Sequence, residues 1–208
     1  MTLVRTVVVS GSASAPSKTL TLAQRILAAV AAELPIEPHL VDIADVGSDL
    51  GRSLGRRDLS PAAERAVALV ESAEILIAAT PVYRGSYTGH FKHLFDLVEV
   101  NSLIDTPVIL AATGGSDKHC LIIEHQLRPL FGFLQSYTVP TGVYASHADF
   151  ENGDVRSPLV LSRIATAARQ AASLARSHAA AKSHPSVPLA ASHGLTLPAP
   201  GTTQQHSH

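Results

Sequence analysis

The feature that most constrains the fold is the alternation of short apolar runs with longer segments of helical period. The valine-rich residues 4–9 are followed by a segment in which Leu20, Ala23, Leu27 and Val30 recur every three or four positions. Later apolar runs are again followed by helical patterns. Strands that alternate with helices form parallel sheets covered by helices on both faces. The sequence therefore predicts an α/β fold.

The number and order of these segments indicate a particular α/β architecture. Helices are expected from about residue 18, from the Ser60-Pro61 cap and at about residues 87–98, 119–135 and 157–177. Strands are expected at residues 4–9, 39–43, 75–79, 108–112 and 138–144. Five strands in alternation with five helices favour a single-domain, flavodoxin-like, doubly wound parallel sheet of order 2-1-3-4-5 over a longer dinucleotide-binding domain.

The composition changes near Ala179. Residues 179–208 are rich in Ala, Ser, Pro and His and show no strand or helix period. Such a segment buries too little apolar surface to offset the entropy of ordering it. We therefore expect a domain over residues 1–178 and a disordered tail over residues 179–208. Metal binding by the tail histidines is the alternative, but they share no ligand-like spacing.

Charge, hydropathy and cysteine content exclude several classes of function. The chain has 16 Lys+Arg against 17 Asp+Glu, and this net charge of -1 argues against binding to nucleic acid or anionic membranes. Its longest apolar runs are far shorter than the roughly 20 residues that a membrane-spanning helix needs. One cysteine, Cys120, excludes an internal disulfide and a cysteine-based metal cluster, and no metal site is expected. The early apolar stretch is too short for a signal peptide, so a cytoplasmic location is expected.

The most unusual loops follow the first, third and fourth predicted strands. In open parallel sheets, ligands bind beyond the carboxyl ends of the strands, where the winding reverses. The first loop, residues 10–19, offers small hydroxyl side chains, a lysine and the N-terminus of a helix. These groups suit a phosphate monoester. The alternative is a serine-rich loop in which Ser17 is an ordinary N-cap.

The second and third loops suit a flat ring. Residues 80–89 include a proline, two tyrosines and an arginine, and they form a longer connection than the usual 2–6 residues. Residues 112–119 contain Gly114-Gly115, which lets the main chain approach a planar ligand closely. The alternatives are an ordinary turn whose tyrosines cover the core, and a flexible turn with a helix cap. The three loops together predict a flavin mononucleotide (FMN) site.

Several motifs resemble the NAD(P)H-dependent FMN reductases. The first loop, the run Pro-Val-Tyr-Arg-Gly-Ser-Tyr-Thr-Gly at residues 81–89 and the run Phe-Lys-His-Leu-Phe-Asp at residues 91–96 carry the resemblance. Residues 111–115, His119 and residues 124–130 are similar to the reductases that supply alkanesulfonate and methanesulfonate monooxygenases. The resemblance implies a flavodoxin-like fold, FMN and NADPH or NADH as cofactors, a homodimer or homotetramer, and a partner monooxygenase.

The resemblance also assigns site residues by position. It implies a phosphate site and a ring site, with His119 near the flavin or nicotinamide ring. The phosphate would be held by Ser12, Ser17 and Thr19, with Lys18 close by, and the isoalloxazine ring by Pro81, Val82, Tyr83, Arg84, Gly85, Ser86, Thr113, Gly114 and Gly115.

Hydride transfer between nicotinamide and flavin needs no catalytic acid–base pair, because the two cofactors carry the reactivity. Arg84 is the candidate for stabilising charge on the flavin or contacting the nicotinamide nucleotide, and a surface ion pair is its alternative role. Two other functions remain open. One is an enzyme that retains FMN and reduces quinones or azo dyes, and the other is a flavodoxin-like electron carrier.

Pro129 lies inside a helical pattern. It has no N–H group, and its ring clashes with the carbonyl four residues earlier, which belongs to His125. A kink or a one-residue π-bulge is therefore expected near His125. The family resemblance implies a π-helix at a subunit interface, linked to flavin release. The alternative is a simple proline kink packed in the core.

Overall fold

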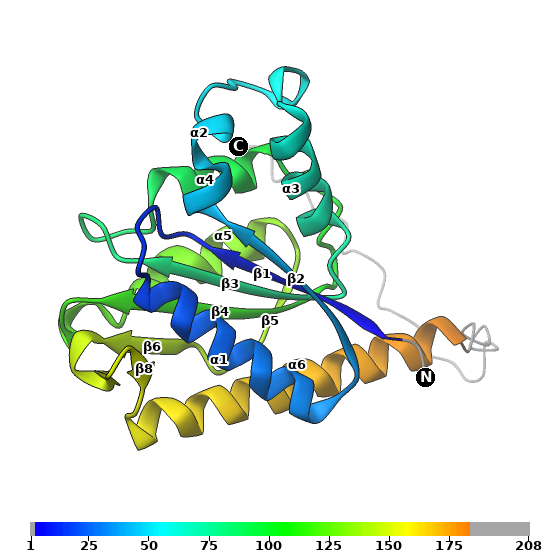
Figure 1. Cartoon of the computed structure of the whole chain (residues 1–208). Coiled ribbons are helices and arrows are strands. Elements are labelled where there is room, and N and C mark those ends of the chain that lie inside the picture. Colours follow the sequence, from blue (N-terminus) through cyan, green and yellow to red (C-terminus); the bar gives the residue numbers. More distant parts are fainter. Residues whose placement is uncertain (1–2, 184–208) are drawn as a thin grey trace, which may run out of the picture.

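A parallel sheet forms the centre of the molecule (Figure 1). The computed structural model describes residues 3–183. The order β2-β1-β3-β4-β5, with β6 also paired to β4, confirms the predicted flavodoxin-like topology. The strands are β1 (Val4–Ser10), β2 (Ile36–Asp42), β3 (Ile75–Pro81), β4 (Pro107–Gly114), β5 (Tyr137–Thr138) and β6 (Val143–Ser146).

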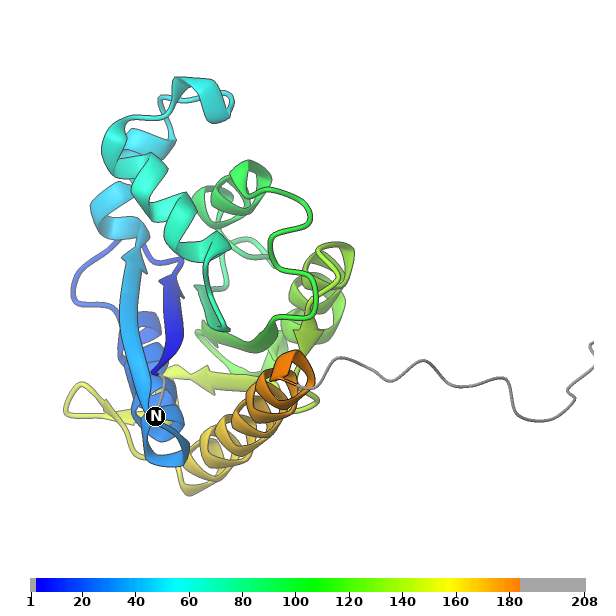
Figure 2. The ribbon, with the colours of Figure 1, turned by 90° about the vertical axis from the view of Figure 1, so that its right-hand side faces the viewer.

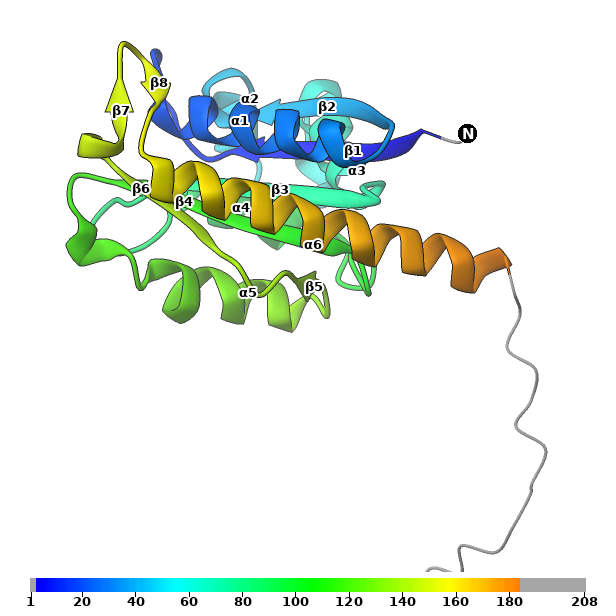
Figure 3. The same ribbon diagram turned by 90° about the horizontal axis from the view of Figure 1, so that it is seen from below.

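Helices cover both faces of this sheet. Figure 2 shows α3 and α4 on one side and α6 on the other, and Figure 3 shows α6 running beneath the sheet beside α1. Within residues 3–183, no helix is long and apolar enough to cross a membrane. The α-helices are α1 (Lys18–Glu33), α2 (Ile43–Leu50), α3 (Pro61–Glu71), α4 (Gly89–Leu97), α5 (Arg128–Phe133) and α6 (Pro158–Ser183).

The continuous apolar runs arise because both faces of the sheet are buried. Successive strand side chains point to opposite faces. Val7 and Val9 therefore join the core cluster that contains α2, α3, α4 and α5 residues, whereas Val8 joins the cluster beneath α1 and α6. In β3, Leu76 and Ile77 divide between the two clusters in the same way. Neither face needs polar residues, which explains the absence of alternation.

The predicted fifth strand is wrong in detail. Residues 138–144 were expected to form one strand, but the structure has two short strands, β5 and β6, that pair with successive parts of β4. Pro140 lies between them and cannot donate a backbone hydrogen bond to the sheet. Gly142 also lies there, and a Cβ atom on it would be only 2.5 Å from Ile123 Cγ2. The interruption lets the backbone at Gly142 pass close to the Ile123 side chain.

Two further elements were not expected. Helix α2 begins directly after β2, where the Asp42 side chain accepts a hydrogen bond from the Ala44 N–H. The strands β7 (Phe150–Glu151) and β8 (Asp154–Val155) form an antiparallel hairpin after β6. Its turn residues Asn152 and Gly153 both have positive φ, which is the geometry that Asn-Gly favours in a two-residue hairpin loop.

The last helix is longer than expected. α6 continues to Ser183, past the expected helix end at residue 177 and past the expected domain boundary at residue 178. Residues 184–208 lie outside the described part of the chain, so the expectation of a tail remains a prediction. The expected start of α3 at the Ser60-Pro61 cap is confirmed, because the Ser60 hydroxyl accepts from the Ala63 N–H and Pro61 is the first helical residue.

Candidate active site

The loops that follow β1, β3 and β4 meet at the carboxyl edge of the sheet. The Gly11 N–H donates to the Ala79 carbonyl at 2.7 Å, and the Thr88 hydroxyl donates to the Gly11 carbonyl at 2.9 Å. The Val82 N–H donates to the Thr113 carbonyl at 2.8 Å. The structure therefore joins the three loops that the sequence singled out by direct hydrogen bonds.

The first loop ends at the N-terminus of α1. The Ser17 hydroxyl accepts a hydrogen bond from the Leu20 N–H at 3.1 Å, so Ser17 is the N-cap. The N–H groups of Lys18 and Thr19 lie in the first turn and have no intrahelical acceptor. Together with the helix dipole, they favour an anion at this point. The N-cap role of Ser17 thus leaves room for a phosphate beside it.

The first three residues of the first loop lie in a closely packed environment. Ser10 is fully buried, and its hydroxyl has no hydrogen-bond partner among the residues that the structure describes. At Gly11 a Cβ atom would lie 2.9 Å from the Phe91 ring and 3.0 Å from the Thr80 hydroxyl. Only glycine lets the chain turn so close to β3 and α4. The buried Ser12 hydroxyl lies 3.3 Å from that of Ser14.

Thr19 and Lys18 have specific partners. The Thr19 and Thr113 hydroxyls lie 2.6 Å apart and are buried, which ties the first turn of α1 to the end of β4. One of these two hydroxyls keeps a hydrogen to donate elsewhere. The Lys18 ammonium lies 5.5 Å from the centre of the Phe150 ring, a cation–π contact. Lys18 is therefore directed toward the β7–β8 hairpin.

The second loop contains a tight hairpin. Tyr83 and Ser86 exchange backbone hydrogen bonds of 2.9 and 3.1 Å, and Arg84 and Gly85 between them have φ of 53° and 82°. Arg84 is exposed at the tip and makes no salt bridge within residues 3–180. The surface ion pair considered for Arg84 is thus absent from the described chain. The Ser86 hydroxyl donates to the Gln126 side chain at 3.1 Å.

The third loop is fastened to β6. The Tyr144 hydroxyl donates to the Ser116 carbonyl at 2.5 Å. The pKa of Tyr144 is raised, mainly by burial and to a smaller extent by the nearby Asp117, Cys120 and Asp149. A Cβ atom on Gly114 would collide with the Tyr144 hydroxyl, whereas one on Gly115 would meet no atom of the described residues within 4 Å. Of the paired glycines, Gly114 is required for packing and Gly115 leaves an open face.

The π-bulge expected from Pro129 is confirmed. A π-helical segment, η3 (Ile123–Leu127), precedes α5, and the Arg128 N–H donates to the Ile123 carbonyl five residues earlier. The Arg128 side chain pairs with Glu124, and its hydrogen bonds lower the pKa of that carboxyl. His125 is exposed on this segment. A simple proline kink is excluded.

A small hollow connects the second loop to the π-helical segment. It has a volume of about 180 Å³. His119, from the short 3₁₀ helix η2 (Asp117–His119), and His125 both contribute to its wall. The other lining residues are Gly85, Lys118, Leu121, Ile122 and Gln126. The structure therefore brings His119 and His125 to the same place as Gly85.

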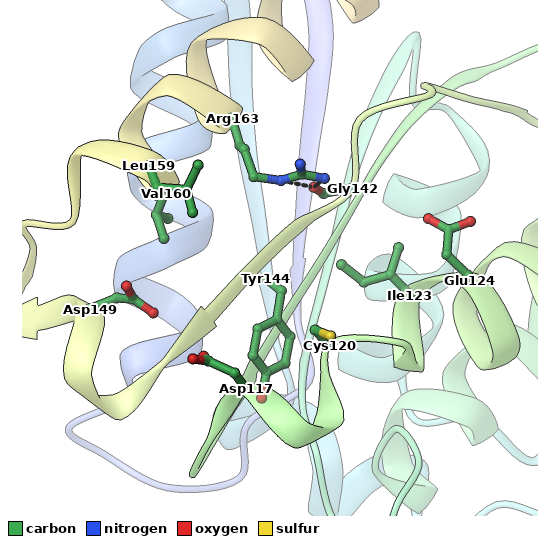
Figure 4. Close-up of a pocket in the computed structure, with 10 residues that line it drawn as sticks. All are labelled: Asp117, Cys120, Ile123, Glu124, Gly142, Tyr144, Asp149, Leu159, Val160 and Arg163. Carbon is green, nitrogen blue, oxygen red and sulfur yellow. Dashed lines mark hydrogen bonds between the residues drawn. The ribbon is translucent and has the colours of Figure 1, made fainter.

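A larger cavity of about 410 Å³ lies between η3, β6 and the first turn of α6 (Figure 4). No local sequence pattern predicts this cavity, since its walls come from segments far apart in the chain. In Figure 4 the Arg163 guanidinium donates to the Gly142 carbonyl, at 3.0 and 2.7 Å, and Tyr144 lies beside Asp117 and Cys120. The remaining lining residues are Ile123, Glu124, Asp149, Leu159 and Val160. No group of three or more metal-ligating side chains occurs in the described chain.

The sheet order and the loops gathered at its carboxyl edge define a flavodoxin-like nucleotide-binding protein. The chain belongs to the NADPH-dependent FMN reductase family, whose model matches residues 4–151. The expectation of an oxidoreductase that uses FMN and NAD(P)H is thereby confirmed.

Individual relatives agree with this assignment. The chain is 51% identical over 172 residues to the NADH-dependent FMN reductase SfnE of Pseudomonas putida, covering 83% of this chain and 92% of that protein. It is 48% identical to an FMN reductase (NADPH) of Pseudomonas aeruginosa, covering 82% and 91%. The structure of an oxidoreductase from Corynebacterium diphtheriae matches with a TM-score of 0.75 and 31% identity, covering 84% and 98%.

Proposed function

We propose that this chain reduces FMN with NADH or NADPH at the carboxyl edge of the sheet and releases the reduced flavin to a partner monooxygenase of the sulfonate type. The proposal rests on one observation: three loops joined by hydrogen bonds meet at one edge of the sheet. The first of them leads into the N-terminus of α1, which can bind a phosphate. A partner of this kind is supported by the resemblance of residues 111–115 and 124–130 to reductases of such systems.

The first loop fits the phosphate of FMN. Ser12, Ser17 and Thr19 supply hydroxyls, and the α1 N-terminus supplies backbone N–H groups. The buried Ser10 hydroxyl, which has no hydrogen-bond partner among the described residues, leaves a donor at the start of this loop. Lys18 lies at the edge of the loop and adds positive charge, although its ammonium already contacts Phe150. Its contribution is therefore electrostatic rather than a fixed hydrogen bond.

The second and third loops fit the isoalloxazine ring. The hairpin turn presents backbone groups near Arg84 and Gly85, and Gly115 offers an open face on the opposite loop. Arg84, which makes no ion pair within the described chain, is available to stabilise negative charge on the ring or to contact the nicotinamide nucleotide. His119 lies close enough to Gly85 to border the ring. The proposed ring-contacting residues are Pro81, Val82, Tyr83, Arg84, Gly85, Ser86, Thr113, Gly114, Gly115 and His119.

When bound, the two cofactors supply the chemistry, which is the transfer of a hydride from the nicotinamide ring to the flavin. The chain has to hold the rings face to face and keep bulk water from them. No side chain has to accept or release a proton in this step, so no acid–base residue is assigned. The same proposal places the protein in the cytoplasm, where reduced nicotinamide nucleotides are formed.

The π-helical segment suits a contact between subunits. We assign His125, exposed on it, to the interface of a homodimer or homotetramer. Exposed Leu121 and Phe133, at 58% and 72%, flank this segment and α5.

Steady-state kinetics test the proposal. The purified chain is mixed with FMN and either NADH or NADPH, and nucleotide oxidation is followed by absorbance. Saturable dependence on FMN, with the flavin exchanging freely, is expected. Flavin that stays bound during quinone turnover would favour the flavin-retaining reductase instead. Absence of nucleotide oxidation would favour the electron carrier, which the near-neutral charge already disfavours.

A substitution at Ser17 tests the phosphate site. Ser17→Asp keeps a good N-cap for α1 and places a carboxylate where the phosphate would lie. FMN binding is expected to weaken by at least about tenfold, while riboflavin, which has no phosphate, binds as before. Ser17→Asn is the neutral control, because asparagine also caps helices. Equal FMN affinity in the aspartate and asparagine variants would remove the first loop from the site.

A further inference from the structure

Tyr144 is a side chain that the sequence analysis did not single out and that the structure joins to the third loop. It lies on β6, half-buried, and its ring packs against the core cluster that contains α2, α3, α4 and α5 residues. Its hydroxyl reaches across to the Ser116 carbonyl at 2.5 Å. The two residues are 28 positions apart in the sequence. The contact is therefore a tertiary one and not part of a local turn.

The third loop depends on this contact for its shape. In the described part of the chain, the Ser116 carbonyl otherwise accepts only a long 3.5 Å bond from the His119 N–H. Ser116 makes no side-chain cap for η2. On the strand side, Gly114 lies directly against the Tyr144 hydroxyl, with no space for a Cβ atom. Tyr144 thus contacts the loop on both sides of Gly115.

The hydroxyl is suited to remain a donor. Burial and the neighbouring Asp117, Cys120 and Asp149 raise the pKa of Tyr144, so the group stays protonated at neutral pH. A protonated hydroxyl donates one hydrogen bond, and the Ser116 carbonyl accepts it.

We propose that Tyr144 is a positioning residue for flavin reduction, which through Ser116 and Gly114 holds the backbone of Gly115 open to the isoalloxazine ring. This inference rests on the proposed function, because it takes the third loop as one wall of the ring site. It assigns Tyr144 no contact with the flavin. Its effect is exerted through the loop, and it should therefore alter ring binding without altering phosphate binding.

The test compares Tyr144→Phe with Tyr137→Phe. The first variant keeps the ring and removes only the hydroxyl. The second is a matched control, because Tyr137 lies on β5 with 49% of its surface exposed and its ring against His178. Dissociation constants for FMN and riboflavin are measured by quenching of flavin fluorescence, together with KM and kcat for FMN reduction and the thermal midpoint.

Tyr144→Phe is expected to raise the dissociation constants of both flavins by the same factor, about three- to tenfold for the loss of one hydrogen bond. The KM for FMN should rise in parallel, with kcat at saturating FMN nearly unchanged. Gly114→Ala leaves Tyr144 intact, but its added methyl group displaces the Tyr144 hydroxyl. It should therefore weaken the binding of both flavins in the same way. Tyr137→Phe should behave as the wild type.

Three results would overturn the inference. Wild-type affinity of Tyr144→Phe for both flavins would show that the hydroxyl does not hold the ring site. Weaker binding of FMN with unchanged binding of riboflavin would show that the Tyr144 hydroxyl acts at the phosphate site. A fall in kcat without a change in either dissociation constant would assign Tyr144 to another step. If the proposed function itself were wrong, the wild-type chain would not oxidise NADH or NADPH with freely exchanging FMN, whereas failure of this inference alone leaves that wild-type activity intact.

Discussion

The packing of Gly114 against Tyr144 leads to a stability prediction that needs no flavin. A Cβ atom added at residue 114 would lie closer to the Tyr144 hydroxyl oxygen than real Cβ atoms come to any neighbour. The next nearest atom is Tyr144 Cζ at 3.2 Å, followed by Cε2 at 3.6 Å. Removal of the hydroxyl oxygen should therefore remove most of the collision. The two substitutions Gly114→Ala and Tyr144→Phe are expected to be strongly coupled.

The magnitudes follow from these contacts. Overpacking a tight site costs about 1–3 kcal/mol. The hydroxyl can yield only by breaking its bond to the Ser116 carbonyl, which is worth about 1 kcal/mol. Gly114→Ala should thus cost about 2–4 kcal/mol in the wild-type chain and less than about 1.5 kcal/mol in the Tyr144→Phe background. The double variant should therefore lose no more than about 2.5 kcal/mol relative to the wild type, less than the sum of the two single variants.

Urea unfolding of the flavin-free protein, followed by far-ultraviolet circular dichroism, measures these free energies. Gly115→Ala is the matched control, since a Cβ atom there meets no atom within 4 Å in the described part of the chain and the position has no positive φ. Its effect should stay within about 0.5 kcal/mol. Equal costs of Gly114→Ala in the two backgrounds would refute the reasoning, because the hydroxyl would then not be the atom that excludes a side chain.

Two further predictions concern other parts of the site. His125→Ala should change the subunit number, measured by sedimentation, or the rate of flavin release. The hydride-transfer rate in single-turnover experiments should change less. Unchanged sedimentation and release would exclude the interface role of the π-helical segment. Burial opposes ionisation of Asp149, but hydrogen bonds from the Ser146 hydroxyl and N–H and from Ser157 outweigh it, so the pKa of Asp149 lies below its ordinary value. Its stabilising contribution is therefore present above pH of about 4 and is lost at lower pH, as the carboxyl is protonated through its folded-state pKa. The wild-type chain should be more stable than Asp149→Asn at pH 7, with a smaller difference in urea midpoint at pH 3, and a constant difference would contradict the assignment.

The sequence by itself determined those features that depend on local patterns. Apolar runs without alternation indicated strands buried on both faces, and the strand order was confirmed. Ser60 caps a helix as its sequence context predicted, and Ser17 takes the N-cap role that was the alternative interpretation of the first loop. Pro129 predicted the π-bulge, since a missing N–H group four residues after His125 disturbs the helix wherever the helix lies. The Asn152-Gly153 turn carried an equally local signal for the β7–β8 hairpin, which the sequence analysis missed.

The tertiary structure alone decided which side chains meet between the loops. Thr19 and Thr113 are 94 residues apart, and Tyr144 on β6 reaches Ser116, which follows the neighbouring strand β4. Pairs of this kind depend on the register of β4 against β6 and on the placement of α1 over the sheet, to which no local pattern refers. The same is true of Gly142, whose closeness to Ile123 accompanies the break between β5 and β6. Local sequence fixes φ, ψ and the buried face of each element, whereas contacts between distant residues are set only once those elements pack together.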